Sequence, residues 1–117
     1  MPAWQFQKAN TIAEKHGWTQ FVSMQNLYNL LYREEEREMI PLLQNQKMAM
    51  IPWSPLAMGQ LCGRNRATTR SIETNAVFGA LYNEKIVDRV EELAQKKNVS
   101  PSQVNKLYNF FTPTIRS

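Results

Sequence analysis

The pattern of apolar residues predicts alternating helices and strands along most of the chain. Apolar side chains recur at helical spacing from Ala3 to His16, and Gly17 follows where a helix-stopping glycine is expected. Short apolar runs in 18–25 and 48–51 have the length of strands. A helix is expected over 34–46, and roughly 22 residues between strands suffice for a crossover, so parallel strands are predicted.

The second half of the chain is predicted to be a long loop followed by two helices. Residues 64–81 are polar and irregular, as in a functional or mobile loop. A helix is expected over 82–97, with apolar residues on one face and lysines at its end. Ser100 and Gln103 have the spacing of a capping box, so a last helix should follow and end before Pro113.

The segment after the second apolar run combines several features of a ligand-binding loop. Residues 48–51 fit a strand covered on both faces, and Pro52 should end its regular part. The run from Trp53 to Gly59 then brings together an aromatic ring, a hydroxyl group, a proline and a glycine. Ligands bind at such carboxyl ends of strands in α/β proteins. A hydrophobic turn that closes a core is the alternative explanation.

Composition is that of an ordinary globular chain. The 117 residues, 43% hydrophobic and 21% charged, are enough for one domain, 1–117, with a modest core. The single cysteine, Cys62, allows no internal disulfide and suits a reducing compartment, so a cytoplasmic location is expected. No apolar run has the length of a membrane span and no signal-peptide pattern is present, so no membrane association is expected.

The net charge of +4 does not by itself indicate a nucleic-acid partner. Basic residues are interleaved with acidic ones, as in 33–38 and 88–92, so no nucleic acid is expected. A local excess remains at Arg64, Arg66 and Arg70. These arginines are either part of a solvated loop or a phosphate-binding site.

Few residues suggest chemistry by themselves. The amide side chains in 25–29 either contact a ligand or bond to their own turn. The one histidine, His16, lies at a predicted helix end, and the one aspartate, Asp88, lies within a predicted helix. The six methionines are read as core residues and Cys62 as a small loop residue, so no metal site is expected.

The order of elements is incomplete for an α/β domain. The first predicted helix has no strand before it and the last has none after it, so the sequence looks cut from a longer α/β repeat. A sheet of two parallel strands leaves two open edges and apolar helix faces. Self-association, or pairing with a full-length relative, is therefore a possible outcome.

Several motifs, in this order, resemble the C-terminal half of an aldo-keto reductase. The resemblance is to the branch with fungal aryl-alcohol dehydrogenases and potassium-channel β-subunits, and it covers about Ala3 to Val104. The motifs are Trp4-Gln5-Phe6, Ser23-Met24-Gln25-Asn26-Leu27-Tyr28-Asn29, Arg33-Glu34-Glu35-Glu36, Pro52-Trp53-Ser54-Pro55-Leu56-Ala57-Met58-Gly59 and Val99-Ser100-Pro101-Ser102-Gln103-Val104. The run from Trp53 to Gly59 after an apolar strand is the most specific of them.

The resemblance implies part of a (β/α)8 TIM barrel that binds NADP(H) at the carboxyl ends of its strands. The two predicted strands would be the sixth and seventh. Gln25 would hold the nicotinamide carboxamide and Trp53 would stack on the nicotinamide ring. The other matching cofactor-binding positions are Ser54, Pro55 and Leu56 along the pyrophosphate, with Arg64 and Arg70 near the phosphates.

The resemblance also implies what this chain lacks. The family's catalytic Asp, Tyr, Lys and His come from the first four strands, and no substitute set is visible here. After Val104 the sequence departs from the family, which continues into an eighth strand. We therefore expect a truncated relative of enzymes that interconvert aromatic aldehydes and alcohols with NADP(H), inactive by itself. The alternatives are an interacting half-barrel and a weak nucleotide-binding module.

Overall fold

The computed structural model describes residues 1–64, 79 and 82–111, with side chains described up to 109. Most of the predicted loop 64–81 lies outside the described residues. Arg66 and Arg70 also lie outside the described residues, so their predicted roles stay predictions.

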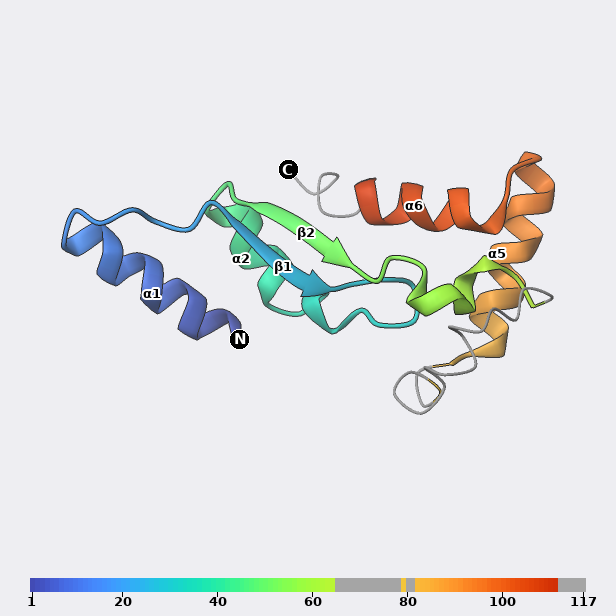
Figure 1. Ribbon diagram of the computed structural model, residues 1–117, viewed down its shortest axis with the longest axis horizontal. Helices are drawn as coiled ribbons and strands as arrows, with labels where there is room; N and C mark the ends of the chain where they lie inside the picture. Colours follow the sequence, from blue (N-terminus) through green and yellow to red (C-terminus); the bar gives the residue numbers. More distant parts are fainter. Residues whose placement is uncertain (65–78, 80–81, 112–117) are drawn as a thin grey trace.

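The described residues form a small α/β structure with two strands and several helices, as the apolar pattern predicted. The elements are α1 (Ala3–Lys15), β1 (Ser23–Leu27), η1 (Glu34–Glu36), α2 (Met39–Asn45), β2 (Ala49–Trp53), η2 (Ala57–Cys62), α5 (Glu84–Lys97) and α6 (Pro101–Phe111). Figure 1 shows them in a row, with α1 at one end, the sheet in the middle and α5 with α6 at the other end.

The two strands are parallel, which confirms the predicted strand–helix–strand unit. Their register pairs Ser23 with Ala49 and Leu27 with Trp53. The helix between them, α2, covers one face of the sheet through Met24, Met48 and Met50, which pack against a buried cluster that includes Leu43. The carboxyl ends of both strands therefore point to the same side, toward η2 and α5.

The first strand begins later than predicted. Within 18–25, the strand expected around Phe21, Val22 and Met24 is instead β1, whose register with β2 begins at Ser23 opposite Ala49. Trp18, Phe21 and Val22 precede the strand and are 63%, 59% and 77% exposed. Phe21 packs on Phe6 of α1, with ring centroids 5.7 Å apart, and Trp18 stacks on His16.

The second strand is covered on one face only, contrary to the expectation of two covered faces. Exposed and half-buried residues alternate along β2, and Ile51 is 51% exposed. The strand also continues through Pro52 to Trp53. Proline is tolerated because its position lacks a ladder bond: Ala49 and Trp53 bond to β1, so Pro52 faces the open edge.

Two helix boundaries also differ from the prediction. The expected helix 34–46 is divided into the 3-10 turn η1 and the helix α2, and Pro41 lies in the first turn of α2, where its missing N–H is not needed. The helix expected from Tyr82 begins at Glu84, because Asn83 caps it by accepting a 3.1 Å hydrogen bond from the Lys85 N–H.

The predicted helix-end signals are confirmed. Gly17 has a φ of +67°, and the Trp18 N–H bonds to the Ala13 carbonyl at 2.8 Å, which ends α1 in a Schellman motif. Ser100 and Gln103 exchange hydrogen bonds of 3.3 and 2.8 Å as a capping box.

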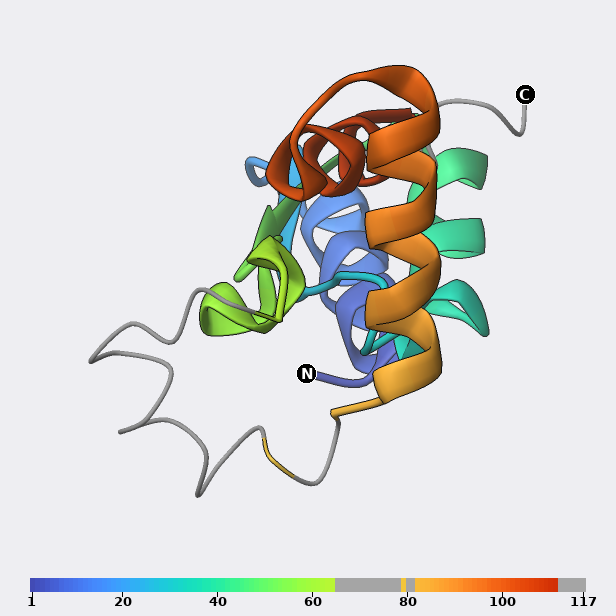
Figure 2. The same ribbon diagram turned by 90° about the vertical axis from the view of Figure 1, so that its right-hand side faces the viewer.

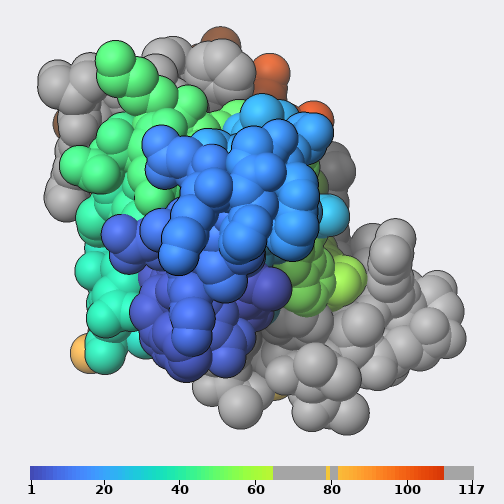
Figure 3. All heavy atoms as spheres, turned by 90° about the vertical axis from the view of Figure 1, so that its left-hand side faces the viewer, coloured from blue at the N-terminus to red at the C-terminus, as the bar shows by residue number. Residues whose placement is uncertain are grey.

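Two separate apolar clusters hold the ends of the molecule. One is built on Phe6, Met39 and Leu43, and the other on Ala57, Leu61, Val87 and Val90. The extents are 53 × 31 × 20 Å and the radius of gyration is 16.6 Å. A compact domain of this length would have about 13 Å. Figures 2 and 3 show the two ends: α5 and α6 form one, and α1 with the segment after it forms the other.

Two substitutions at helix ends should change the free energy of unfolding in opposite directions. Lys47 follows α2 with a φ of +54°, a conformation in which a side chain costs about 1 kcal/mol. Lys47→Gly should therefore raise the free energy of unfolding by about 1 kcal/mol, and Gly17→Ala should lower it by a similar amount. Urea unfolding followed by circular dichroism measures both. A Lys47→Ala variant, which keeps the cost, should remain near the parent.

Candidate functional site

Gln25 and Trp53 lie on the same face of the sheet, close to its carboxyl end. Gln25 pairs with Ile51 in the register, and the next pair on that face is Leu27 with Trp53. Gln25 is exposed and Trp53 is 38% exposed, because α2 packs on the opposite face. The parallel register thus brings together an amide and an aromatic ring that are far apart in the sequence.

The amide side chains in 25–29 differ in their exposure and in their hydrogen-bond partners. Asn29 is 1% exposed, and its Oδ1 accepts from the N–H groups of Leu31 and Tyr32 at 2.9 and 3.0 Å. Its Nδ2 donates to the Ser54 carbonyl at 3.0 Å, which ties the two strand ends together. Asn26 is buried and donates to Glu35 at 3.1 Å. Of these three residues, Gln25 is the one whose side chain is exposed.

The loop after Trp53 has an unusual backbone. Ser54, Ala57 and Met58 have φ values of +55°, +48° and +56°, although none of them is glycine. Each such residue costs of order 1 kcal/mol, and clusters of this kind are typical of ligand-binding segments. The Ser54 Oγ accepts a 3.2 Å hydrogen bond from the Met58 N–H, which leaves its own hydroxyl proton able to donate.

Helix α6 supports this loop through buried amides. Asn105, with no exposed surface, donates from Nδ2 to the Leu61 carbonyl at 2.9 Å. Asn109 donates to the Pro55 carbonyl at 3.3 Å. Asn105 and Asn109 therefore help to fix the position of the loop that carries Ser54, Pro55 and Leu56.

Arg64 is bound to acidic residues of α5. Its guanidinium forms ion pairs with Asp88 and, at 2.8 Å, with Glu84, and its backbone N–H bonds to Glu91 at 2.7 Å. The bond to Asp88 raises the pKa of Arg64 further. A phosphate group at Arg64 would have to displace or share with these carboxylates.

A polar network that the sequence did not reveal joins the β1 end to α6. Tyr28 is fully buried, and its ring stacks on Tyr108 with centroids 5.6 Å apart. Glu36 Oε1 accepts from the Tyr28 and Tyr108 hydroxyls at 2.8 and 2.7 Å. Arg33 donates to both Glu36 oxygens at 2.8 and 2.7 Å. The only sequence signal is an ordinary Arg-Glu spacing, which usually marks a solvated face.

The network keeps Glu36 ionised. The hydrogen bonds from Arg33, assisted by those from Tyr108 and Tyr28, lower the pKa of Glu36 to about 2 despite its burial. Burial, by contrast, raises the pKa of Tyr108. A fixed carboxylate thus lies between two tyrosines, and it orients them rather than exchanging protons near neutral pH.

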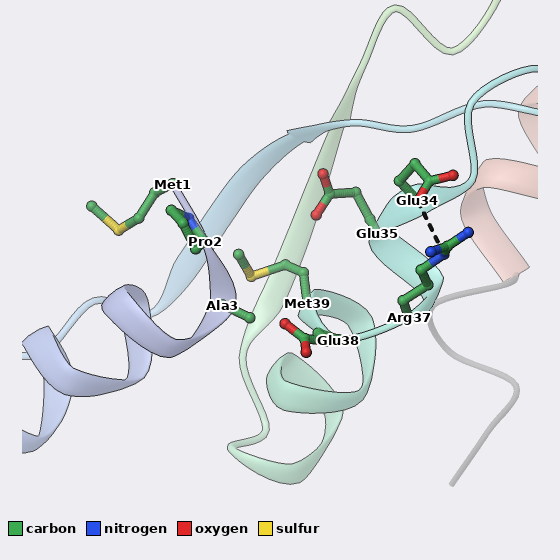
Figure 4. Close-up of a pocket in the computed structure, with 8 residues that line it drawn as sticks. All are labelled: Met1, Pro2, Ala3, Glu34, Glu35, Arg37, Glu38 and Met39. Atoms are coloured by element: carbon green, nitrogen blue, oxygen red, sulfur yellow. Dashed lines mark ion pairs between the residues drawn. The ribbon is translucent and has the colours of Figure 1, made fainter.

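Two hollows lie away from Gln25 and Trp53. One, of about 270 Å³, is shown in Figure 4: Met1, Pro2 and Ala3 line one side, and the other is lined by Glu34, Glu35, Arg37, Glu38 and Met39. The second, of about 460 Å³, is an apolar groove along α5 and α6, with Leu30, Ile86 and Leu93 among its lining residues. Neither contains a sequence-predicted site residue.

The remaining candidate residues of the sequence have structural contacts. Among them, no group of three or more His, Cys, Asp or Glu side chains could hold a metal ion. In the same part of the chain, no helix is long and apolar enough to cross a bilayer. His16 caps the end of α1 and stacks on Trp18 at 4.9 Å, and Asp88 pairs with Arg64. Cys62 accepts a 3.4 Å contact from the Ser102 hydroxyl.

Comparison with known protein families decides the relationship. The model of the aldo/keto reductase family matches residues 1–110. This chain belongs to the aldo-keto reductase family. The family folds as a (β/α)8 barrel and generally uses nicotinamide cofactors, and the two parallel strands described above are a part of such a barrel.

Individual relatives are fungal reductases and dehydrogenases. A Schizosaccharomyces pombe protein named "putative aryl-alcohol dehydrogenase" is 54% identical over 86% of this chain and 30% of its own length. The versiconal hemiacetal acetate reductase of Aspergillus parasiticus is 43% identical over 97% of this chain and 36% of its own length. An aldo-keto reductase of Fusarium vanettenii is 46% identical over 89% of this chain and 30% of its own length. The chain thus spans about a third of these relatives and is aryl-alcohol dehydrogenase-like.

The Glu36 network gives a prediction with a defined pH dependence. Glu36→Gln should lower the free energy of unfolding by about 1–2 kcal/mol near neutral pH, because the charge-assisted bonds to Arg33 are lost. The folded pKa of about 2 lies below that of an unfolded glutamate, so the contribution is present above about pH 4.5 and is lost as the pH falls toward 2. Urea midpoints of the two proteins should therefore converge on acidification.

The matched control is Glu92→Gln. Glu92 pairs with Arg89 at the same spacing, but both side chains are more than 60% exposed. Exposed pairs contribute little, so this variant should unfold close to the parent at every pH. An equal loss in both variants would show that the network around Glu36 has no special contribution.

Proposed function

We propose that this chain forms the nicotinamide-facing part of an NADP(H)-dependent aldo-keto reductase of the aryl-alcohol dehydrogenase type. The supporting observation is the shared sheet face of Gln25 and Trp53, followed directly by the strained loop 54–59. An exposed ring beside an exposed amide is suited to a flat, carboxamide-bearing ring such as nicotinamide. When bound, this cofactor supplies hydride transfer to or from a carbonyl carbon.

The residues present fit the nicotinamide half of such a cofactor. Trp53 would stack against the ring, and Gln25 would donate to and accept from its carboxamide. The Ser54 hydroxyl, whose proton is not used within the loop, would donate to the pyrophosphate. The fit depends on the backbone of 54–59, which the amides of α6 hold in place.

The phosphate contacts are less complete. Arg64 already has carboxylate partners on α5, so it would contribute to phosphate binding only by exchanging them. Arg70, the other matching arginine, lies outside the described residues. Weak binding is therefore proposed for the 117-residue chain alone, with the preference for NADP(H) over NAD(H) resting on the family resemblance.

We also propose that the chain alone does not turn over aromatic aldehydes or alcohols. Reduction of a carbonyl requires a proton donor close to the carbonyl oxygen. The residues that share the sheet face with Gln25 and Trp53 are Ser23, Leu27, Ala49 and Ile51. None of them is an acid that could supply a proton at neutral pH.

Cofactor binding is tested by titrating NADPH into the pure chain and following its own nicotinamide fluorescence, since three tryptophans complicate quenching. Trp53→Ala should weaken binding by about tenfold, the magnitude of a lost stacking contact. Trp53→Phe should retain part of the affinity. Trp18→Ala, which removes a 63% exposed ring before β1, is the matched control and should bind like the parent.

The opposite results would contradict the proposed site. Equal NADPH affinities of the parent and Trp53→Ala would remove Trp53 from it. A folded parent chain that gives no fluorescence change at any NADPH concentration would leave only the family relationship.

A separate measurement addresses turnover. The pure chain, mixed with NADPH and an aromatic aldehyde, should give no NADPH consumption above the rate without protein. Sustained oxidation of NADPH by the folded chain would show that a proton donor exists within it, and would refute the proposed inactivity.

A further inference from the structure

The outer edge of β1 carries a regular row of unpaired backbone groups. The Val22 carbonyl accepts from the Ala49 N–H at 3.0 Å, and the Tyr28 N–H donates to the Trp53 carbonyl at 3.4 Å. The backbone N–H and C=O groups of successive residues point to alternate sides of a strand. Those of the even-numbered residues from Val22 to Tyr28 therefore face β2. The N–H and C=O groups of Ser23, Gln25 and Leu27 consequently point away from β2, and no hydrogen bond to another described group satisfies them.

The outer edge of β2 is much less available. Pro52 has no N–H to donate, and it faces this edge. The Met48 N–H, before the strand, is already bonded to the Leu43 carbonyl at 2.8 Å. A blocked edge of this kind is a common protection against strand addition. The two edges of the sheet therefore differ, and β1 is the one that can accept another strand.

The free edge of β1 is complementary to itself. When two copies meet antiparallel about a two-fold axis through Gln25, Gln25 lies opposite its counterpart and Ser23 lies opposite Leu27. In an antiparallel ladder, opposed residues whose backbone groups face each other exchange two hydrogen bonds. The spacing of the free groups satisfies this for every pair.

We propose that two copies of this chain associate through their β1 edges, in antiparallel orientation, to form a continuous four-stranded sheet. The order would be β2–β1–β1–β2, with Pro52 on both outer edges. A closed two-fold contact uses the same surface on both copies, which is the commonest arrangement of homodimers. This proposal concerns backbone groups at the edge and does not depend on cofactor binding at the sheet face.

Partly exposed apolar side chains beside the edge favour the same contact. Phe21 and Val22, directly before β1, are 59% and 77% exposed. In the paired arrangement they lie alongside the end of the partner's β1. The two-fold axis is perpendicular to the sheet, so the faces that carry Ile51, 51% exposed, lie on one side and form a single surface.

The association is tested by sedimentation equilibrium of the pure chain over a wide range of concentrations. We expect a reversible monomer–dimer equilibrium. A species that is folded and monomeric at every concentration would overturn the proposal, and so would assembly that continues beyond the dimer.

Two variants locate the contact. Gln25→Lys places like charges opposite each other at the two-fold axis, and should raise the dimer dissociation constant by about tenfold or more. Ser23→Pro removes a donor from the free edge while leaving the ladder to β2 intact, and should weaken the dimer as well. Gln7→Lys, at another exposed glutamine, on α1, is the matched control and should dimerise like the parent.

Folding of each variant is checked by its thermal melt, and cofactor binding is measured separately. Dimers that persist unchanged in both edge variants would place the contact elsewhere and refute the β1 edge. A dimer lost equally in Gln7→Lys would do the same. Trp53→Ala should dimerise normally, so that failure of cofactor binding and failure of association are distinguished.

Discussion

The parallel pairing of β1 with β2 is the constraint on which the rest of the structure depends. It places two strand ends side by side, so that Gln25 and Trp53 share a face although a whole helix separates them in the sequence. The same pairing lets Asn29 reach the Ser54 carbonyl and fixes where the strained loop begins. Because α2 covers only one face, the opposite face keeps its side chains accessible.

The molecule compensates for a divided core with buried polar contacts. Neither apolar cluster extends across the whole length, so the α5–α6 end is joined to the strand end by specific bonds as well as by apolar packing. The stacked Tyr28 and Tyr108 rings with Glu36 form one such joint, and Asn105 forms another with the Leu61 carbonyl. Bonds of this kind are directional, so they specify how α6 lies against the loop after Trp53.

The sequence predicted what local chemistry determines. The end of α1 at Gly17, the Ser100 capping box and the parallel unit around α2 follow from residues near one another. The predicted start of β1 was wrong because the limits of a strand depend on a partner strand that is distant in the sequence. Phe21 has the apolar character of a strand residue, but it lies before the residues that pair with β2. The Glu36 network could not be predicted, since Tyr108 is far away in the chain and only folding brings it to Tyr28. The family resemblance singled out Gln25 and Trp53, but that they share one face of the sheet follows from the register of β1 with β2.

The position of Pro52 has a consequence for how far a sheet of this kind can grow. A strand that offers hydrogen-bonding groups along both sides can be extended indefinitely, which is how ribbons and fibrils arise. Here one side is interrupted by a residue without a donor, so addition is favoured on the other side. Pairing of two copies through β1 would therefore occupy the edge that favours strand addition, and Pro52 on the outer edges would limit further growth of the sheet.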